Sequence, residues 1–252
     1  MTTLDNPGLA VQITNLIGKP IELGVKKLPA SVSRRIGLTT QAALRASLRL
    51  AVATLSDDRG AKASTGAHKG LATLSGAIGG AFGLPALAIE LPVSTTIIMR
   101  SIADIARSQD EDIRSVEAQL ACIEVFAFGS RAESDDGAET GYYATRAALS
   151  AAVADAAKYI AERGMAEEGA PAIVRLITRI AARFSVPVSE KFAAQSIPVI
   201  GAAGGAAINL IFINHFQDMA RGHFTVRRLE RQYSEACVRE EYERIRQWGN
   251  YT

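Results

Sequence analysis

The sequence predicts an all-α fold, a single multi-helix domain with little or no β-structure, on three observations. Apolar residues recur at helical spacing along most of the 252 residues. Period-two alternation never lasts for the length of a strand with turn signals on both sides. Hydrophobic residues make up 48% of the chain and aromatics only 6%, so the apolar content is mainly aliphatic and suits closely packed helices. No linker-like tract divides the chain, which is therefore interpreted as one domain over residues 1–252.

The N-terminal part carries most of the positive charge of a chain whose net charge is only +2. Residues 1–70 hold 10 Lys and Arg against 4 Asp and Glu. The spacing of Ile36, Leu44 and later apolar residues predicts an amphipathic helix from Ser31 to Leu55. A shorter helix is expected before it, between Pro20 and Pro29.

The basic side chains of this amphipathic helix are the expected contact with a membrane surface. They are Arg34, Arg35, Arg45 and Arg49. Anionic lipid is the better expected partner than nucleic acid, because base-stacking aromatic residues are missing from this part of the chain. The alternative is that these charges only keep one face of a helix in water.

Two long glycine-rich stretches dominate the rest of the sequence. The first, Leu71 to Met99, has one charged residue, Glu90, and is long enough to cross a bilayer. Pro85 and Pro92 interrupt it, so two short helices joined by a bend are expected rather than one spanning helix. The second stretch runs from Phe192 to Asn214 without a charge.

The two stretches share a pattern of small residues. GAIGGA at Gly76 to Ala81 is echoed as GAAGGA at Gly201 to Ala206, 125 residues later. Small residues four apart let helix backbones approach closely, so the two glycine-rich helical hairpins are expected to pack together, with lipid contact as the alternative role. The residues expected in this role are Gly76, Gly79, Gly80, Gly83, Gly201, Gly204 and Gly205.

One helix is expected directly after the first stretch. It runs from Ser115 to Phe128 and is predicted to stop at Gly129. The polar residues over 130–141 then predict an exposed loop.

Three more helices are expected in the second half of the chain. An apolar stripe from Leu149 to Ile160 predicts the first, and Pro171 starts the next, which is predicted to stop at residues 185–187. The last begins in the second glycine-rich stretch and is expected to continue without a break to about Trp248, so that residues 225–248 form a charged C-terminal helix.

Glu90, Glu124, His215 and His223 form a candidate buried polar centre, because each lies on an otherwise apolar helix face. Glu90 and His215 each follow the first glycine of their stretch by 14 residues, so His215 is the expected partner of Glu90, with Arg100 as the alternative. Two carboxylates and two histidines are sufficient for a metal site or an acid–base pair. The alternative is that they are hydrogen-bonded core residues.

Other polar residues are expected to have structural roles. Asp104 and Asp218 each precede an arginine by three residues, Arg107 and Arg221, and are expected to form ion pairs on helix faces. His68 is expected in an exposed loop or at the start of a helix.

Several ordered blocks of this sequence resemble the EcsC family. They are GGAFGLP at Gly79 to Pro85 leading to Glu90-Leu91-Pro92, RSIADIAR at Arg100 to Arg107, Leu120 to Gly129, PVIGA at Pro198 to Ala202, Asn209, His215-Phe216 and His223-Phe224. Two positions depart from the family pattern: Asp110, where the family tends to have glycine, and Ser234. The resemblance implies a bacterial protein, cytoplasmic or membrane-associated. The family's namesake is associated with an ABC exporter system, and the family has no settled activity to transfer.

The sequence contains none of the common enzyme signatures, such as a phosphate-binding loop or a nucleophile elbow. No secretory or transit signal is visible at the N-terminus, so a cytoplasmic location is expected, at the inner face of the cell membrane. Cys122 and Cys237 are far apart and are expected to be buried thiols rather than a disulfide or zinc ligands.

The leading functional hypothesis is a non-enzymatic, membrane-associated protein. Its expected partner is anionic lipid or a membrane protein, for which the resemblance points to an ABC transporter or a secretion system. No cofactor and no metal are expected. The alternatives are a metal-dependent hydrolase that uses Glu90, Glu124, His215 and His223, and a soluble helical adaptor. The oligomeric state is left open.

Overall fold

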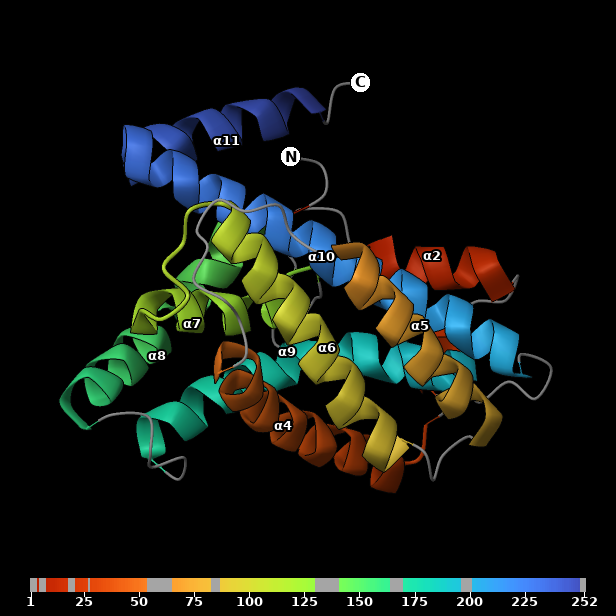
Figure 1. The fold of residues 1–252 in the computed structure, drawn as a ribbon. Coiled ribbons are helices and arrows are strands. Elements are labelled where there is room, and N and C mark those ends of the chain that lie inside the picture. Colours follow the sequence, from red (N-terminus) through yellow and green to blue (C-terminus); the bar gives the residue numbers. More distant parts are fainter. Residues whose placement is uncertain are drawn as a thin grey trace.

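Helix α10 (Gly201–Tyr233) crosses the molecule diagonally, and most of the other long helices pack against it (Figure 1). The computed structural model describes residues 4, 8–17, 21–26, 28–53, 65–82, 87–129, 141–163, 170–195 and 201–249. The other elements are α2 (Gly8–Ile17), α3 (Ile21–Lys26), α4 (Ala30–Ala53), α5 (Thr65–Phe82), α6 (Leu87–Ser108), α7 (Val116–Glu124), η2 (Val125–Ala127), α8 (Tyr142–Arg163), α9 (Pro171–Gln195) and α11 (Glu235–Gly249). Within these residues there are helices and no strand, which confirms the all-α prediction.

Helices α5 and α10 form the most extensive helix pair among the described residues. Two hydrogen bonds set their antiparallel register: the Asn209 side chain donates to the Ala72 carbonyl, 2.8 Å, and the Gln217 side chain donates to the Thr65 carbonyl, 3.2 Å. Both helices rise about 1.5 Å per residue, so the same register can be extended toward their glycine-rich ends. Residue 76 would then lie opposite residue 205. The packing of the glycines themselves stays a prediction, and Gly83 lies outside the described residues.

The first glycine-rich stretch contains the end of one helix and the start of another. α5 ends at Phe82 and α6 begins at Leu87, and Pro85 lies outside the described residues. At Pro92 the helix continues to Ser108, which corrects the expectation that both prolines break it.

Helix α9 also continues past a proline that was expected to end it. Pro187 is buried inside the helix, which runs on to Gln195. An internal proline costs a helix roughly 3 kcal/mol. The following turns bury Val188, Phe192 and Ala194 against the core, and this apolar burial offsets the cost.

The aromatic core lies where α7, η2, α9 and α10 meet. Phe126 of η2 packs edge-on against Phe184 of α9, with ring centroids 4.7 Å apart, and both contact Phe216 of α10. Ser115 caps α7 by accepting a hydrogen bond from the backbone N–H of Ala118. These contacts hold the end of the α7–η2 segment in the centre of the molecule.

The expected C-terminal helix is two helices. α10 ends at Tyr233, α11 begins at Glu235, and Ser234 between them has φ +84°, a left-handed value that a right-handed α-helix cannot accommodate. Asp110 has φ +64° at the end of α6, where the Glu111 N–H donates to the Ala106 carbonyl in a Schellman-type cap. The two departures from the family pattern therefore coincide with left-handed residues.

Replacing Ser234 by glycine is expected to stabilise the protein by about 0.5–1 kcal/mol, because glycine adopts a left-handed φ without the steric cost of a Cβ atom. Urea unfolding measures the change. Ser150→Gly on the exposed, regular face of α8 is the matched control, and it is expected to destabilise. A loss of stability in Ser234→Gly as large as in the control would contradict this explanation.

Within the described residues, no helix combines the length and the hydropathy that a membrane span requires.

Candidate functional site

Glu90 and Lys191 form a buried ion pair between α6 and α9. The Lys191 Nζ lies 2.6 Å from Glu90 Oε1, and the two side chains are 1% and 5% exposed. Asn209 of α10 donates a second hydrogen bond to the same carboxylate oxygen, 3.2 Å, and Lys191 Nζ also lies 4.9 Å from the centre of the Phe212 ring. Because Asn209 binds Ala72 as well, this one cluster joins α5, α6, α9 and α10.

This cluster corrects the expected partner of Glu90. The carboxylate is buried and compensated, as its position between apolar residues requires. Its partner, however, is Lys191 rather than His215 or Arg100. The equal offset of Glu90 and His215 from their glycines does not bring them together, because the antiparallel α5–α10 pair places Asn209 beside the start of α6.

A second polar cluster joins the start of α8 to α10 through side chains. The Tyr142 hydroxyl lies 2.8 Å from His223 Nδ1, and both side chains are fully buried. The Arg146 guanidinium donates to the same hydroxyl oxygen at 3.4 Å, which leaves the hydroxyl hydrogen for His223. This arrangement favours the tautomer of His223 that is protonated at Nε2, an atom with no hydrogen-bond partner among the described residues.

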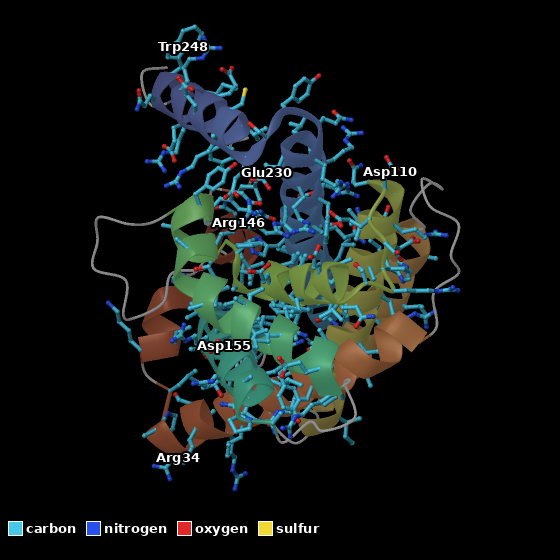
Figure 2. All side chains as sticks on the ribbon, turned by 90° about the vertical axis from the view of Figure 1, so that its left-hand side faces the viewer. Arg34, Asp110, Arg146, Asp155, Glu230 and Trp248 are labelled. Carbon is cyan, nitrogen blue, oxygen red and sulfur yellow. The ribbon has the colours of Figure 1, made fainter. Side chains whose placement is uncertain are left out.

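Two groups of ion pairs border this cluster. Arg146 also binds Glu230 at 2.6 Å, and Figure 2 shows these two labelled side chains side by side between α8 and α10. In the second group, Arg227 and Arg231 of α10 both bind Glu111. Burial would raise the pKa of Glu111, but the hydrogen bonds and charges of these two arginines hold that pKa below its usual value.

Glu124 is the most perturbed carboxyl group of this region. Burial raises its pKa to about 7, against the opposing charges of Arg146 and Arg227. A carboxyl group that titrates near neutrality can exchange a proton at physiological pH, so this is the group with the clearest capacity for acid–base chemistry. His223 stays neutral, because burial first and then the charges of Arg227 and Arg146 put its pKa well below the usual value.

Replacing Glu124 by glutamine is expected to change how stability depends on pH. The folded-state pKa of Glu124 is raised, so its favourable contribution is present below about pH 4.5 and is lost as the pH rises through about 7. Glu124→Gln removes this loss. The free energy of unfolding of the variant, relative to that of wild type, should therefore rise by on the order of 2–3 kcal/mol between pH 5 and pH 8.

Urea unfolding of both proteins at pH 5 and pH 8 measures this gain. The buried histidines have lowered pKa values, so their contribution to stability rises with pH in the same range. This contribution is the same in both proteins, and it cancels when the stability of wild type is subtracted from that of the variant. A difference that is the same at both pH values would show that Glu124 does not titrate near neutrality.

His215 is packed against the end of the α7–η2 segment. Gly129 has φ +71°, and a Cβ atom built on it would lie 2.6 Å from His215 Cε1 and 3.0 Å from Met219 Sδ. Burial lowers the pKa of His215 to about 4, so the ring is neutral. The positive φ confirms the predicted stop at Gly129, and the contact gives His215 a packing role.

The four predicted residues do not gather into one centre. Glu90 belongs to the Lys191 cluster, Glu124 and His223 lie near Arg146 and Arg227, and His215 lies against Gly129. Among the residues that the structure describes, no group of three or more His, Cys, Asp or Glu side chains is arranged to hold a metal ion.

The predicted ion pairs of Asp104 and Asp218 are confirmed. Arg107 lies 2.5 Å from Asp104, and Arg221 lies 2.7 Å from Asp218. The Asp104–Arg107 pair is buried rather than on a solvent-exposed helix face. His68, in the first turn of α5, is also buried, and its Nε2 lies 3.9 Å from Asp104 Oδ2.

The cysteines divide between the core and the surface. Cys122 is buried as expected, and burial raises the pKa of its thiol. Cys237 is exposed on α11, which corrects the expectation of a second buried thiol.

Sequence reasoning missed Lys191, Tyr142 and the arginines of the second cluster. A signal for Lys191 was present, because it lies seven residues after Phe184 and continues the apolar stripe of α9. The predicted stop at Pro187 cut that stripe short. Tyr142 and Arg146 carried no such signal, because their partners are more than 80 residues away in the chain.

The fold and these clusters define an all-helical protein whose interior is joined by buried ion pairs and hydrogen bonds. A model of the EcsC protein family matches residues 9–229 of the 252-residue chain. The chain therefore belongs to the EcsC protein family. No curated protein and no solved structure matches the chain.

Proposed function

We propose that this protein is a non-enzymatic binding protein that docks on the anionic surface of a membrane through the outward face of α4. The docked protein would lie at the inner face of the cell membrane. There it would be placed to contact a membrane protein, and the family resemblance makes an ABC transporter the first candidate.

The outward face of α4 is the observation that carries the proposal. The helix has four arginines and no acidic residue over its 24 positions. Arg34 and Arg35 are exposed and Arg45 is half-buried, and none of the three forms an ion pair with a described carboxylate. Arg49 also lies in α4, but its side chain is outside the described part. Uncompensated basic side chains on one helix face are the form of site that attracts anionic headgroups.

An exposed apolar residue accompanies these charges. Leu38 lies one helical turn after Arg34 and Arg35 and is 62% exposed, while Ile36 and Leu44 face the core. An apolar side chain beside basic ones supports binding at the boundary between headgroups and acyl chains. The start of α6 likewise exposes Ile89, which supports a second shallow contact.

Replacing Arg34 and Arg35 by glutamine is expected to weaken binding to anionic vesicles about 30-fold at low salt, since each basic residue near the surface contributes about 1 kcal/mol. Co-sedimentation with anionic vesicles measures the partition coefficient. Extending the change to Arg45 and Arg49 should weaken binding further.

The matched control is Arg244→Gln with Arg246→Gln, which removes the same charge from exposed positions of α11. Figure 2 shows Arg34 and Trp248 of α11 at opposite ends of the molecule, so the control leaves the α4 end unchanged. Equal weakening in both double variants would attribute binding to net charge and would remove α4 as the docking face.

A further inference from the structure

An apolar groove separates α11 from the C-terminal half of α10. Its volume is about 580 Å³, within the range of sites that hold small molecules. Its apolar lining includes Leu4, Val226, Leu229, Val238 and Ile245. The groove exists because Ser234 turns the chain and lets α11 fold back along α10, as Figure 1 shows.

An aliphatic side chain already fills one part of this groove. Leu4 lies against Gly222, so closely that a Cβ atom on Gly222 would be 2.6 Å from Leu4 Cγ. Leu4 is only 4% exposed. The groove therefore keeps water away from one aliphatic group at Leu4, and Val226 and Leu229 of α10 continue the apolar lining beside it.

The dimensions favour a chain-like ligand over a protein partner. A water molecule takes roughly 30 Å³ in the liquid and a methylene group is similar in size, so a groove of about 580 Å³ has room for roughly 19 carbons. A stable protein–protein interface buries about 1,200–2,000 Å² of surface, and the residues that line the groove expose far less surface than that.

The described charged residues of the lining are one arginine and two carboxylates, of which Glu241 is paired with Arg244. Among the described residues that line the groove, Arg221 is the one arginine, beside Asp218, Thr225 and Glu241. Arg221 pairs with Asp218 at 2.7 Å, but both side chains are about half exposed, at 45% and 50%. A pair this exposed contributes little, and Arg221 has N–H donors besides the one that Asp218 accepts, so the guanidinium can also bind a carboxylate in the groove.

We propose that this groove binds one long-chain fatty acid, with the acyl chain along α10 and α11 and the carboxylate at Arg221. This site is independent of the α4 docking face, which lies at the other end of the molecule (Figure 2).

Cys237 provides the readout in the unmodified protein. It lines the groove and is exposed, whereas Cys122, the only other cysteine, is buried. Saturated fatty acids of increasing length, kept below micelle formation, should slow the reaction of Cys237 with a thiol reagent at least tenfold at saturation.

The affinity for the fatty acid should rise about fourfold per added methylene, because each contributes about 0.8 kcal/mol, and it should then level off when the groove is full. Arg221→Gln should weaken binding of the fatty acid but should leave binding of the fatty alcohol of equal length unchanged.

Thr225→Phe, which fills the groove from α10, should abolish protection of Cys237, and Thr178→Phe on the exposed face of α9 is the matched control. Circular dichroism confirms that both variants are folded, and the chain-length series on wild type needs no variant. The proposal is overturned if fatty acids leave the rate unchanged, if affinity rises with length without levelling off, or if protection appears only with vesicles of neutral phospholipid.

Discussion

Replacing Lys191 by methionine is expected to lower the free energy of unfolding by about 3–5 kcal/mol, because it leaves the buried Glu90 carboxylate without its positive partner. Lys191 Nζ lies 2.6 Å from Glu90 Oε1 in a site where both side chains are almost fully buried. Only the hydrogen bond from Asn209 then remains to compensate the charge. Urea unfolding at pH 7 measures the loss.

The double variant Glu90→Leu with Lys191→Met is the control for this interpretation. It removes both charges and keeps apolar groups of similar size in their place, so it should recover most of the stability that Lys191→Met alone loses. If the double variant is as unstable as the sum of the two single variants, the pair is not coupled and the cluster does not join the helices as described.

Replacing Gly129 by alanine is expected to cost about 2–5 kcal/mol, for two reasons that act together. The left-handed φ of +71° is costly for any residue with a Cβ atom, and the added atom would lie 2.6 Å from His215 Cε1. The ring of His215 is buried against Phe216, with centroids 5.0 Å apart, and has little room to move. Thermal or urea unfolding detects a change of this size.

Gly37 and Gly70 are the matched controls for Gly129. They lie within α4 and α5, and a Cβ atom on either meets nothing within 4 Å. Alanine at these positions should stabilise by up to about 1 kcal/mol, because glycine is a poor helix former. A Gly129→Ala protein as stable as wild type would mean that the turn after η2 and the His215 ring move apart freely.

The sequence alone was sufficient to predict the helices that have regular apolar stripes. Leu149, Ala156 and Ile160 of α8 and Ile173, Ile180 and Phe184 of α9 are buried as their spacing predicts. The errors concern helix ends. Pro187 suggested a stop where burial of later residues keeps the helix intact, and at Ser234 no proline or glycine marks the break between α10 and α11.

The polar clusters were predictable only in part. Burial of Glu90, Glu124, His215 and His223 followed from their positions on apolar faces. Their partners did not, because pairing depends on which helices meet and in what register. Lys191 reaches Glu90 across 101 residues and Tyr142 reaches His223 across 81, and no local spacing encodes either contact.

Flotation of the wild-type protein with vesicles of two compositions is the most direct test of the proposed membrane docking. The α4 face predicts that the protein rises with vesicles rich in anionic phospholipid at low ionic strength and stays behind with vesicles of neutral phospholipid. Recovery with the anionic vesicles should fall steeply as salt is raised from about 0.05 to 0.5 M, because the Debye length shortens over this range. Equal recovery with both vesicle types at every salt concentration, or no recovery with either, would contradict docking through the basic face of α4.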